Sequence, residues 1–250
     1  MAGRSSAASG ESVASRVFAV LDCFRHGKST MTLSEVAAMS GIPLSTTRRL
    51  LLELTAWGGM ERLADGSYRI GMRLWELGSL APRQRDLRDA ASPYMHDLYE
   101  AAEENVQLSV IDGLEVLCVE KLYGRRAVPT ETDVGERMPL HATAAGKALL
   151  AFSGPEVLHA VVDTGLPRLT PNTLVEPGRL TAALQRTRET GLAYSFEERT
   201  RGVVSVASPM ISPDGRLLGA IGIVARVGTR LDRLAPAVRT AALTISRAIA

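Results

Sequence analysis

Five consecutive residues carry the clearest chemistry in the chain: Ser45, Thr46, Thr47, Arg48 and Arg49. Hydroxyl and guanidinium groups bind phosphates and base edges in DNA, and an arginine matches the paired acceptors of guanine. The same residue types also form ordinary solvated helix faces. These residues alone therefore leave a DNA-reading surface and a solvated surface equally open.

The residues around this run predict two helices joined by a tight turn. Apolar side chains recur at helical spacing on both sides of Gly41, at Leu33, Val36 and Ala37 before it and at Leu50, Leu51 and Leu54 after it. Gly41 suits a turn with positive φ, Pro43 fixes the chain before the second helix, and Ser45 is the predicted N-cap. The apolar residues would join the helices and leave residues 45–49 facing outward, as in a helix-turn-helix that enters a major groove.

A further helix precedes this pair. Residues 12–26 carry an apolar stripe at helical spacing that ends before Gly27, and this helix would complete a three-helix core. Arg16 lies outside the stripe. Its guanidinium would either contact a phosphate or remain solvated.

A hairpin is predicted directly after the second helix. Asp65-Gly66 separates two short runs, 60–63 and 68–70, and this is a strong hairpin signal. A hairpin in that position is a wing. Arg62, Ser67 and Tyr68 would then contact phosphates or a minor groove, or else the hairpin would only cover the helical core.

A linker helix is predicted over residues 77–92. Pro82 and Pro93 punctuate the connection. Residues 83–89 carry nearly balanced charges, which favours a solvated helix over a DNA clamp.

The remainder, residues 93–250, alternates between helical segments and strand pairs. The strand pairs turn at Asp112-Gly113 and Asp214-Gly215, and a helix is predicted over residues 141–152. Strand hairpins with accompanying helices predict an antiparallel α+β domain.

Small residues mark a candidate pocket in this second domain. Ala142–Gly146 have almost no side-chain bulk at a predicted helix start, where free backbone N–H groups bind carboxylates. Ser205 alternates with valines in a predicted strand, and Gly219 and Gly222 leave room beside the next strand. These residues indicate either a ligand pocket or close packing of a helix on the sheet.

Catalytic motifs are missing from the sequence. It contains neither GxSxG nor HExxH, Gly146-Lys147 fails the phosphate-loop pattern, and the histidines are scattered. Cys23 and Cys118 lie far apart, without a Cys/His cluster that would hold zinc. We therefore expect no catalytic residue, no metal site and no cofactor.

The composition is that of a globular protein with material for two domains. The chain has 250 residues with 46% apolar content, and its net charge of +2 is too small to indicate nucleic-acid binding by itself. No apolar run approaches the roughly 20 residues that span a bilayer, and the first ten residues lack the apolar core of a signal peptide. We expect a cytoplasmic protein with a mobile tail at residues 1–11 and no membrane partner.

Four segments, in order, resemble the IclR-type bacterial transcriptional regulators: SRVFAVLDCF, LSEVAAMSGIPLSTTRRLLLELTAWG with the wing after it, MPLHATAAGKALLAF and GLAYSFEERTRGVVSVASPMISPDGRLLGAIGI. The resemblance implies a winged helix-turn-helix at residues 12–76, a linker helix at 77–92, and a GAF/profilin-like effector-binding and oligomerisation domain at 93–250. It also implies a homodimer or a dimer of dimers, a double-stranded DNA operator and a small-molecule effector.

The resemblance also places the site residues. It puts the DNA-reading helix at residues 45–49 and a helix-1 arginine at Arg16, and it puts the effector pocket at Ala144, Ala145, Gly146, Glu197, Ser205, Gly222 and Val224. Gly222 and Val224 depart from relatives that carry serines there and bind small keto acids. The pocket thus has fewer donors, and the effector, a carboxylate or an aromatic acid, stays open.

The leading hypothesis is an effector-responsive transcriptional regulator, a repressor by expectation, without enzymatic activity. Arg16, Arg49 and the wing would hold phosphates, while Thr46, Thr47 and Arg48 would read bases. One alternative is a metabolite-processing enzyme with an accessory DNA-binding domain. The other is a winged-helix module that binds proteins.

Overall fold

The computed structural model describes residues 12–26, 28–125, 128 and 132–249. The chain divides into two compact units, Met1–Pro82 and Arg83–Ala250. The mobile tail predicted for residues 1–11 and the helix stop predicted at Gly27 lie outside the described residues. Each unit has its own hydrophobic core, and we describe the two separately.

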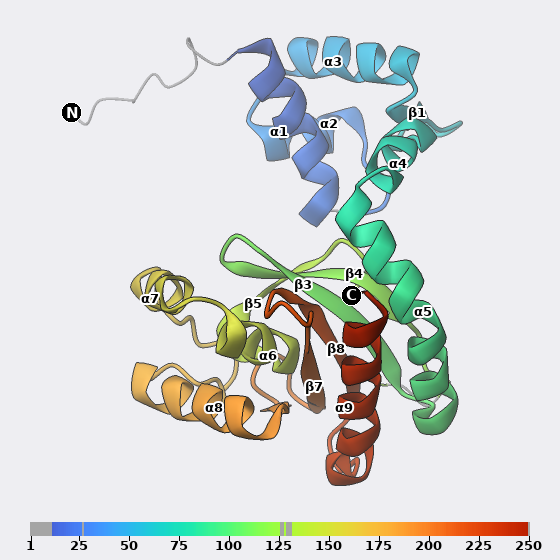
Figure 1. The fold of residues 1–250 in the computed structure, drawn as a ribbon. Coiled ribbons are helices and arrows are strands. Elements are labelled where there is room, and N and C mark those ends of the chain that lie inside the picture. The colour runs from blue at the N-terminus through green and yellow to red at the C-terminus, as the bar shows by residue number, and fades with distance from the viewer. Residues whose placement is uncertain (1–11, 27, 126–127, 129–131, 250) are drawn as a thin grey trace, which may run out of the picture. The chain divides into compact units, whose positions relative to one another are not determined.

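The N-terminal unit is a winged helix-turn-helix (Figure 1). Its elements are α1 (Val13–His26), α2 (Leu33–Ser40), α3 (Leu44–Trp57), β1 (Met60–Arg62), β2 (Tyr68–Ile70) and α4 (Met72–Ser79). Val20, Val36, Leu50, Leu51 and Met60 meet in its core, so all three predicted helices and the hairpin contribute to it. The fold predicted for this part of the chain is confirmed.

Two local features set the geometry of the helical pair. Gly41 ends α2 with a φ of 69°, the left-handed conformation that the turn requires. Thr32 and Glu35 form a capping box at the start of α2, in which the Glu35 carboxylate accepts a hydrogen bond from the Thr32 N–H at 2.8 Å. Backbone and side-chain hydrogen bonds from Thr32 lower the pKa of Glu35 to about 2.

The helix α3 starts one residue before its predicted N-cap. Pro43 occupies the N-cap position and Leu44 is the first helical residue, so Ser45 lies inside the first turn and the prediction that it caps the helix is wrong. The Thr47 hydroxyl donates to the carbonyl oxygens of Ile42 and Pro43, both at 3.2 Å, and ties the turn to the helix.

The linker also differs from its prediction. Two helices, α4 and α5 (Pro82–Ala102), take the place of the single linker helix predicted over residues 77–92, and Pro93 lies within α5 instead of ending the connection. A proline inside a helix costs about 3 kcal/mol. Ala91, Met95 and Leu98 of α5 are buried, and burying a large apolar side chain stabilises the fold by about 1.5–3 kcal/mol, so the packing outweighs the proline.

The second unit contains a six-stranded antiparallel sheet with the order β5-β4-β3-β8-β7-β6. Its strands are β3 (Asn105–Asp112), β4 (Glu115–Leu122), β5 (Arg137–Pro139), β6 (Ala193–Phe196), β7 (Val203–Ile211) and β8 (Leu217–Arg226). Its further helices are α6 (Ala144–Phe152), α7 (Pro155–Asp163), α8 (Pro177–Thr190) and α9 (Leu231–Ala248), with a 3-10 turn η1 (Leu140–Ala142) before α6. The predicted α+β class is confirmed.

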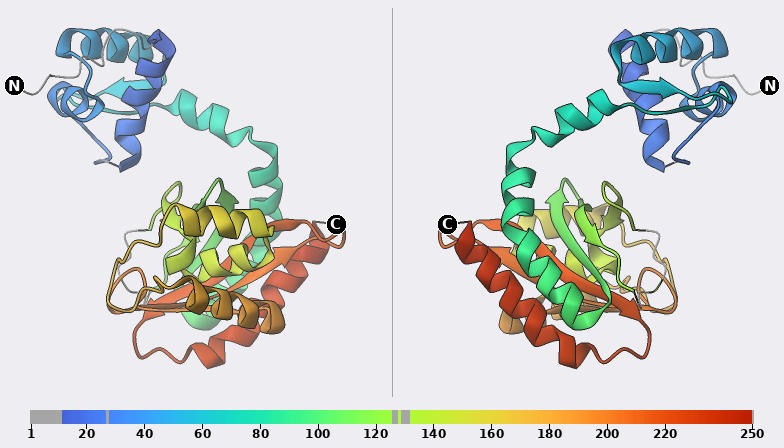
Figure 2. Two further views of the ribbon diagram at one scale, coloured as in Figure 1. Left: turned by 90° about the vertical axis from the view of Figure 1, so that its left-hand side faces the viewer. Right: turned by 90° about the vertical axis from the view of Figure 1, so that its right-hand side faces the viewer.

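Helices cover both faces of this sheet, as the two side views show (Figure 2). On one face, Val206 and Ile223 pack with Met95 of α5 and Val238 of α9. On the other face, Ala207 and Ala220 pack under α6 and α8. The small residues of β7 and β8 therefore face the α6 side, where they leave space at the start of that helix.

Three details of this unit were not predicted. The short strands β5 and β6 lie at the two edges of the sheet. The helix predicted over residues 141–152 begins only at Ala144, because Thr143 is its N-cap and accepts a hydrogen bond from the Gly146 N–H at 3.0 Å. His141 instead lies buried in η1 and bonds the Pro167 carbonyl at 3.1 Å.

Candidate DNA-reading surface and effector pocket

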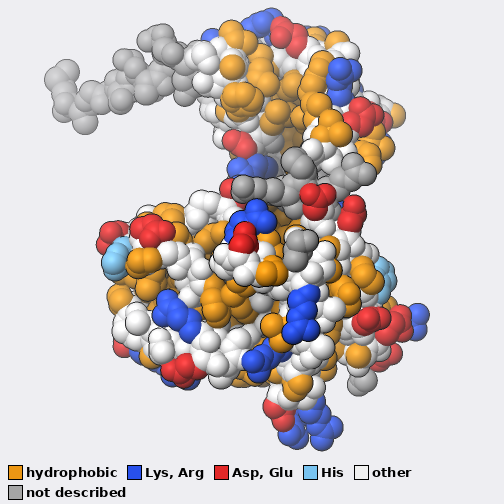
Figure 3. All heavy atoms as spheres, viewed as in Figure 1, with side chains coloured by type: hydrophobic (Ala, Val, Ile, Leu, Met, Phe, Trp, Pro, Cys, Tyr) orange, Lys and Arg blue, Asp and Glu red, His pale blue; other side chains and the backbone are white. Residues whose placement is uncertain are grey.

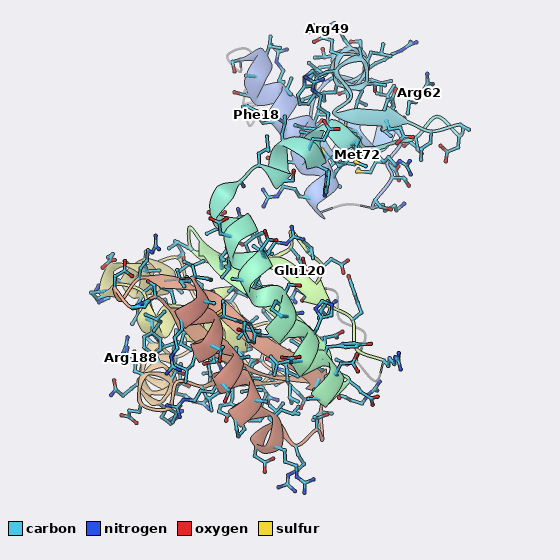
Figure 4. The ribbon with its side chains drawn as sticks, turned by 45° about the vertical axis from the view of Figure 1, so that its right-hand side comes forward. Phe18, Arg49, Arg62, Met72, Glu120 and Arg188 are labelled. Atoms are coloured by element: carbon cyan, nitrogen blue, oxygen red, sulfur yellow. The ribbon has the colours of Figure 1, made fainter. Side chains whose placement is uncertain are left out.

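The first turns of α3 present most of the predicted DNA-reading residues on the surface. Ser45, Arg48 and Arg49 are exposed and Thr46 is half-buried. Arg49 Nη1 lies 2.9 Å from Glu53 Oε1 one turn further on (Figure 4 labels Arg49). This ion pair is open to solvent on both sides, so a phosphate can compete for the guanidinium at small cost.

Thr47 is the exception within the run. Its side chain is buried, and the hydroxyl is engaged with the backbone of the turn. The predicted base contact from Thr47 does not fit this geometry. Its position in the sequence could not reveal this, because residues 46 and 47 differ only in which side of the helix they face.

The predicted DNA-binding residues of the wing are likewise partly exposed and partly buried. Arg62 is exposed, with its guanidinium 5.9 Å from the centre of the Tyr68 ring (Figure 4). Ser67 and Tyr68 are buried. The Ser67 hydroxyl donates to Asp65 at 2.6 Å, and the backbone of Tyr68 pairs with that of Met31. The predicted contacts from Ser67 and Tyr68 to DNA thus become structural contacts, and Arg62 remains the candidate.

Arg16, the last of the predicted DNA-binding residues, lies half-buried in the first half of α1. The predicted DNA-binding residues that remain available on the surface are therefore Ser45, Thr46, Arg48 and Arg49 on α3 and Arg62 on the wing. All of these residues belong to the N-terminal unit, so their mutual arrangement does not depend on the second unit.

A pocket opens in the second unit where α6 begins above the sheet. It encloses about 50 Å³. Its described lining comes from five strands, from the turn before α6, from the start of α6 and from two loops: Gln107, Thr132, Met138, Ala142, Thr143, Ala144, Ala145, Ser195, Arg199, Thr200, Val203, Ser205, Val206, Ala207, Gly222, Ile223 and Val224.

Five of the predicted pocket residues meet in this lining. They are Ala144, Ala145, Ser205, Gly222 and Val224. The backbone N–H groups of Ala144 and Ala145 precede the first hydrogen bond inside α6. A helix start of this kind favours an anion.

The other two predicted pocket residues do not line the cavity. A Cβ on Gly146 would collide with the backbone of Leu140, so this glycine allows close packing of η1 against α6. Glu197 turns its carboxylate to the Gly202 N–H at 2.6 Å and has a φ of 55°. It braces the segment between β6 and β7.

Several lining residues were missed from the sequence, chiefly Gln107, Thr132, Ser195, Arg199 and Thr200. Arg199 and Thr200 lie two and three residues after the predicted Glu197, close enough for that prediction to have included them. Gln107 could be placed in the pocket only from its pairing with Gly222 across β3 and β8. That pairing depends on the sheet topology, which the sequence does not reveal.

A buried ion pair supports the segment that carries Arg199. Lys147 Nζ lies 2.6 Å from Glu198 Oε1, and the two side chains are 3% and 7% exposed. Burial lowers the pKa of Lys147, while the Glu198 carboxylate opposes that shift. The Glu198 carbonyl also accepts a hydrogen bond from the Thr173 hydroxyl at 2.6 Å. The residue before Arg199 is therefore held in place by both its side chain and its backbone.

Within the described residues, no cluster of three or more His, Cys, Asp or Glu side chains is placed to hold a metal ion. In the same part of the chain, no helix has the length and apolar character needed to cross a membrane.

Comparisons with known proteins agree with this geometry. Residues 13–63 match the IclR helix-turn-helix domain, and residues 80–247 match the bacterial transcriptional regulator IclR C-terminal domain. The chain belongs to the IclR family. It is therefore a helix-turn-helix transcriptional regulator, as the resemblance implied.

Relatives of similar length support the assignment. The chain is 32% identical to the HTH-type transcriptional regulator KipR of Bacillus subtilis, over 92% of this chain and 94% of KipR. It is 33% identical to the HTH-type transcriptional repressor AllR of Salmonella typhi, over 83% of this chain and 77% of AllR.

Solved structures of the family share the fold. An IclR homolog from Microbacterium hydrocarbonoxydans, crystallised in complex with 4-hydroxybenzoate, matches with a TM-score of 0.88 and 32% identity. That match covers 94% of this chain and 98% of the homolog. The IclR of Thermotoga maritima matches with a TM-score of 0.77 and 26% identity, over 94% and 98% of the two chains.

Proposed function

We propose that this IclR-family regulator is a cytoplasmic repressor that binds a duplex operator as a homo-oligomer and changes its DNA affinity when a small organic acid enters the pocket. The outward face of α3, flanked by the wing, carries the proposal. Ser45, Thr46 and Arg48 would read base edges, while Arg16, Arg49 and Arg62 would hold phosphates.

Exposed apolar side chains support self-association through the N-terminal unit. Helix α4 contains no fully buried residue, and Met72 and Trp75 on it are 68% and 65% exposed. Phe18 on α1 is 63% exposed (Figure 4 labels Phe18 and Met72). Figure 3 shows hydrophobic side chains gathered on the visible face of this unit. Apolar surface of this kind marks protein interfaces, and a second copy would supply the second half-site reader of a helix-turn-helix dimer.

The pocket supports a small acid as effector. The start of α6 offers backbone N–H groups, and a structural neighbour binds 4-hydroxybenzoate. No catalytic reaction is part of the proposal.

The test is selection of duplexes from a random library by the full-length protein. The proposal predicts enrichment of a palindromic or repeated site, with loss of that preference in the double variant Ser45→Ala/Arg48→Ala. A double variant at Arg25 and Lys28, basic residues outside the α3 face, is the control. Enrichment of no site by the folded wild-type protein would contradict the proposal.

A further inference from the structure

The effector pocket is smaller than the molecules that this fold would have to accept. Its volume is about 50 Å³. An apolar cavity that binds benzene measures about 150 Å³. An effector of aromatic size therefore lies wholly inside the pocket only if part of the wall moves.

The part of the wall that can move is held by side chains. The floor consists of strands β3, β8 and β7, whose ladders are continuous beneath the pocket. Opposite these strands, the Arg199 side chain forms the wall that we call the roof. It donates to Thr132 Oγ1 at 2.6 Å and to Glu136 Oε1 at 2.5 Å. This bridge joins the β6–β7 segment to residues 132–136 before β5, and a rotation of the Arg199 side chain would break it.

The described lining contains a guanidinium and no carboxylate. Among the described lining residues Arg199 alone carries a charge. Gln107 is 6% exposed, and its Nε2 meets no hydrogen-bond partner among the described residues. A buried amide donor without a partner is costly, so a ligand acceptor at this point would be favourable. Together with the N–H groups at the start of α6, these donors fit an anion with a second acceptor.

We propose that the effector's carboxylate replaces Glu136 as the partner of Arg199, and that this exchange of ion pairs opens the roof of the pocket. The inference rests on the proposed function and names the group that recognises the effector. Glu136 is 27% exposed and Arg199 is 22% exposed, so the released carboxylate turns to water at small cost. One ion pair is lost and one is gained, while Gln107 Nε2 donates to the second acceptor.

The experiment compares acids with their neutral amides on the full-length protein. The probes are benzoate and benzamide, 4-hydroxybenzoate and 4-hydroxybenzamide, and pyruvate and pyruvamide, measured by thermal shift and calorimetry. At least one acid should bind, and its amide should bind roughly 10- to 100-fold more weakly. Arg199→Gln should weaken the acid by a similar factor, while Arg199→Lys should keep the preference for acid over amide.

Glu136→Gln distinguishes an exchange from simple attraction. It removes the competing carboxylate, so the acid should bind about two- to fivefold more tightly. Arg201→Gln and Glu115→Gln are the matched controls, since Arg201 is exposed outside the pocket and Glu115 pairs with Arg137 at 3.5 Å. Both should bind like the wild-type protein.

Three results would overturn the inference: no acid binds, an amide binds as well as its acid, or Arg199→Gln binds the acid like the wild-type protein. Failure of the proposed function is read separately, from operator binding by the unliganded wild-type protein. A protein that binds its operator and responds to an acid independently of Arg199 would refute this inference alone.

Discussion

The two candidate sites of this molecule differ in how their polar groups are held before a ligand arrives. The outward face of α3 carries Arg48 and Arg49 in solvent, on a helix whose buried side is packed into the core. The proposed effector pocket instead keeps Arg199, the one charged group among its described lining residues, paired to Glu136. The proposed DNA-reading face is thus preformed, whereas the proposed effector would have to rearrange its pocket.

This difference has a physical consequence for affinity. A preformed face loses little conformational freedom on binding, so its affinity should follow side-chain identity and salt. A pocket that must open shifts a conformational equilibrium, and only the ligand's differential affinity for the open arrangement drives that shift.

The largest expected effect concerns the second copy. Trp75→Asp places a charge on the exposed apolar side of α4 and should prevent self-association. Operator affinity should then fall toward the non-specific level, by about 100-fold or more, because one half-site reader is lost. Sedimentation and fluorescence anisotropy measure the two effects, with the exposed Leu169→Asp as control. A dimeric Trp75→Asp variant with wild-type operator affinity would show that α4 is not the surface through which the protein self-associates.

Arg48→Ala should have the next largest effect. Loss of a bidentate contact to guanine should cost roughly 1–3 kcal/mol and relax the preference at one base pair. Competition assays with single-base operator variants measure both quantities. Arg25→Ala, at the other end of the helical core on α1, should leave the preference unchanged. An equal loss on every sequence would make Arg48 a phosphate contact instead.

Thr32→Ala tests whether the cap of α2, which supports the α3 face, affects DNA reading. The substitution removes the capping hydroxyl of α2 and should lower the free energy of unfolding of this unit by about 1 kcal/mol. Both tryptophans of the chain, Trp57 and Trp75, belong to this unit, so their fluorescence in urea reports its unfolding. Operator preference should stay as in the wild-type protein. A changed operator preference would show that the cap of α2 and the α3 face are coupled.

Acid should weaken the same cap. The folded-state pKa of Glu35 is about 2 against 4.5 for an unperturbed glutamate, so the unfolded chain binds this proton more readily. The stabilisation is complete above pH 4.5 and is lost as the pH falls toward 2. Urea midpoints from tryptophan fluorescence at pH 6 and pH 3 should therefore differ less in Glu35→Gln than in the wild-type protein. An identical pH dependence in both proteins would contradict the assigned cap.

Thr47→Val should have no effect on base preference, which makes it the sharpest test of burial. Its hydroxyl is engaged with Ile42 and Pro43 inside the unit, so base preference should not change. The free energy of unfolding should fall by about 1 kcal/mol for the lost hydrogen bond. A changed base preference in selected duplexes would show that Thr47 reaches the groove.

Local signals predicted the winged helix-turn-helix well. Gly41, the apolar spacing around it and Asp65-Gly66 act over a few residues, so the sequence alone indicated the helices and the wing. Pro93 misled the prediction, because the packing of Met95 and Leu98 against distant strands decides whether the helix continues. Burial of Thr47, Ser67 and Tyr68 likewise depends on contacts that periodicity does not resolve.

The pocket was less predictable for the same reason. Ala144 and Ala145 were found because a helix start is a local feature. Arg199 acquires its role from Thr132 and Glu136, more than sixty residues earlier in the chain, and Gln107 acquires its role from the pairing of β3 with β8. Residue types alone could not distinguish the packing glycine Gly146 from the lining glycine Gly222.

The most direct measurement of the central claim is the salt dependence of duplex binding by the full-length protein. A fluorescent duplex that carries the selected site is titrated by anisotropy over a series of KCl concentrations. If residues 45–49 enter a groove, the logarithm of the affinity should fall linearly and steeply with the logarithm of salt, and Arg49→Ala should reduce the slope by about one. An affinity that is flat with salt, or an Arg49→Ala slope equal to that of the wild-type protein together with unchanged affinity, would contradict the account.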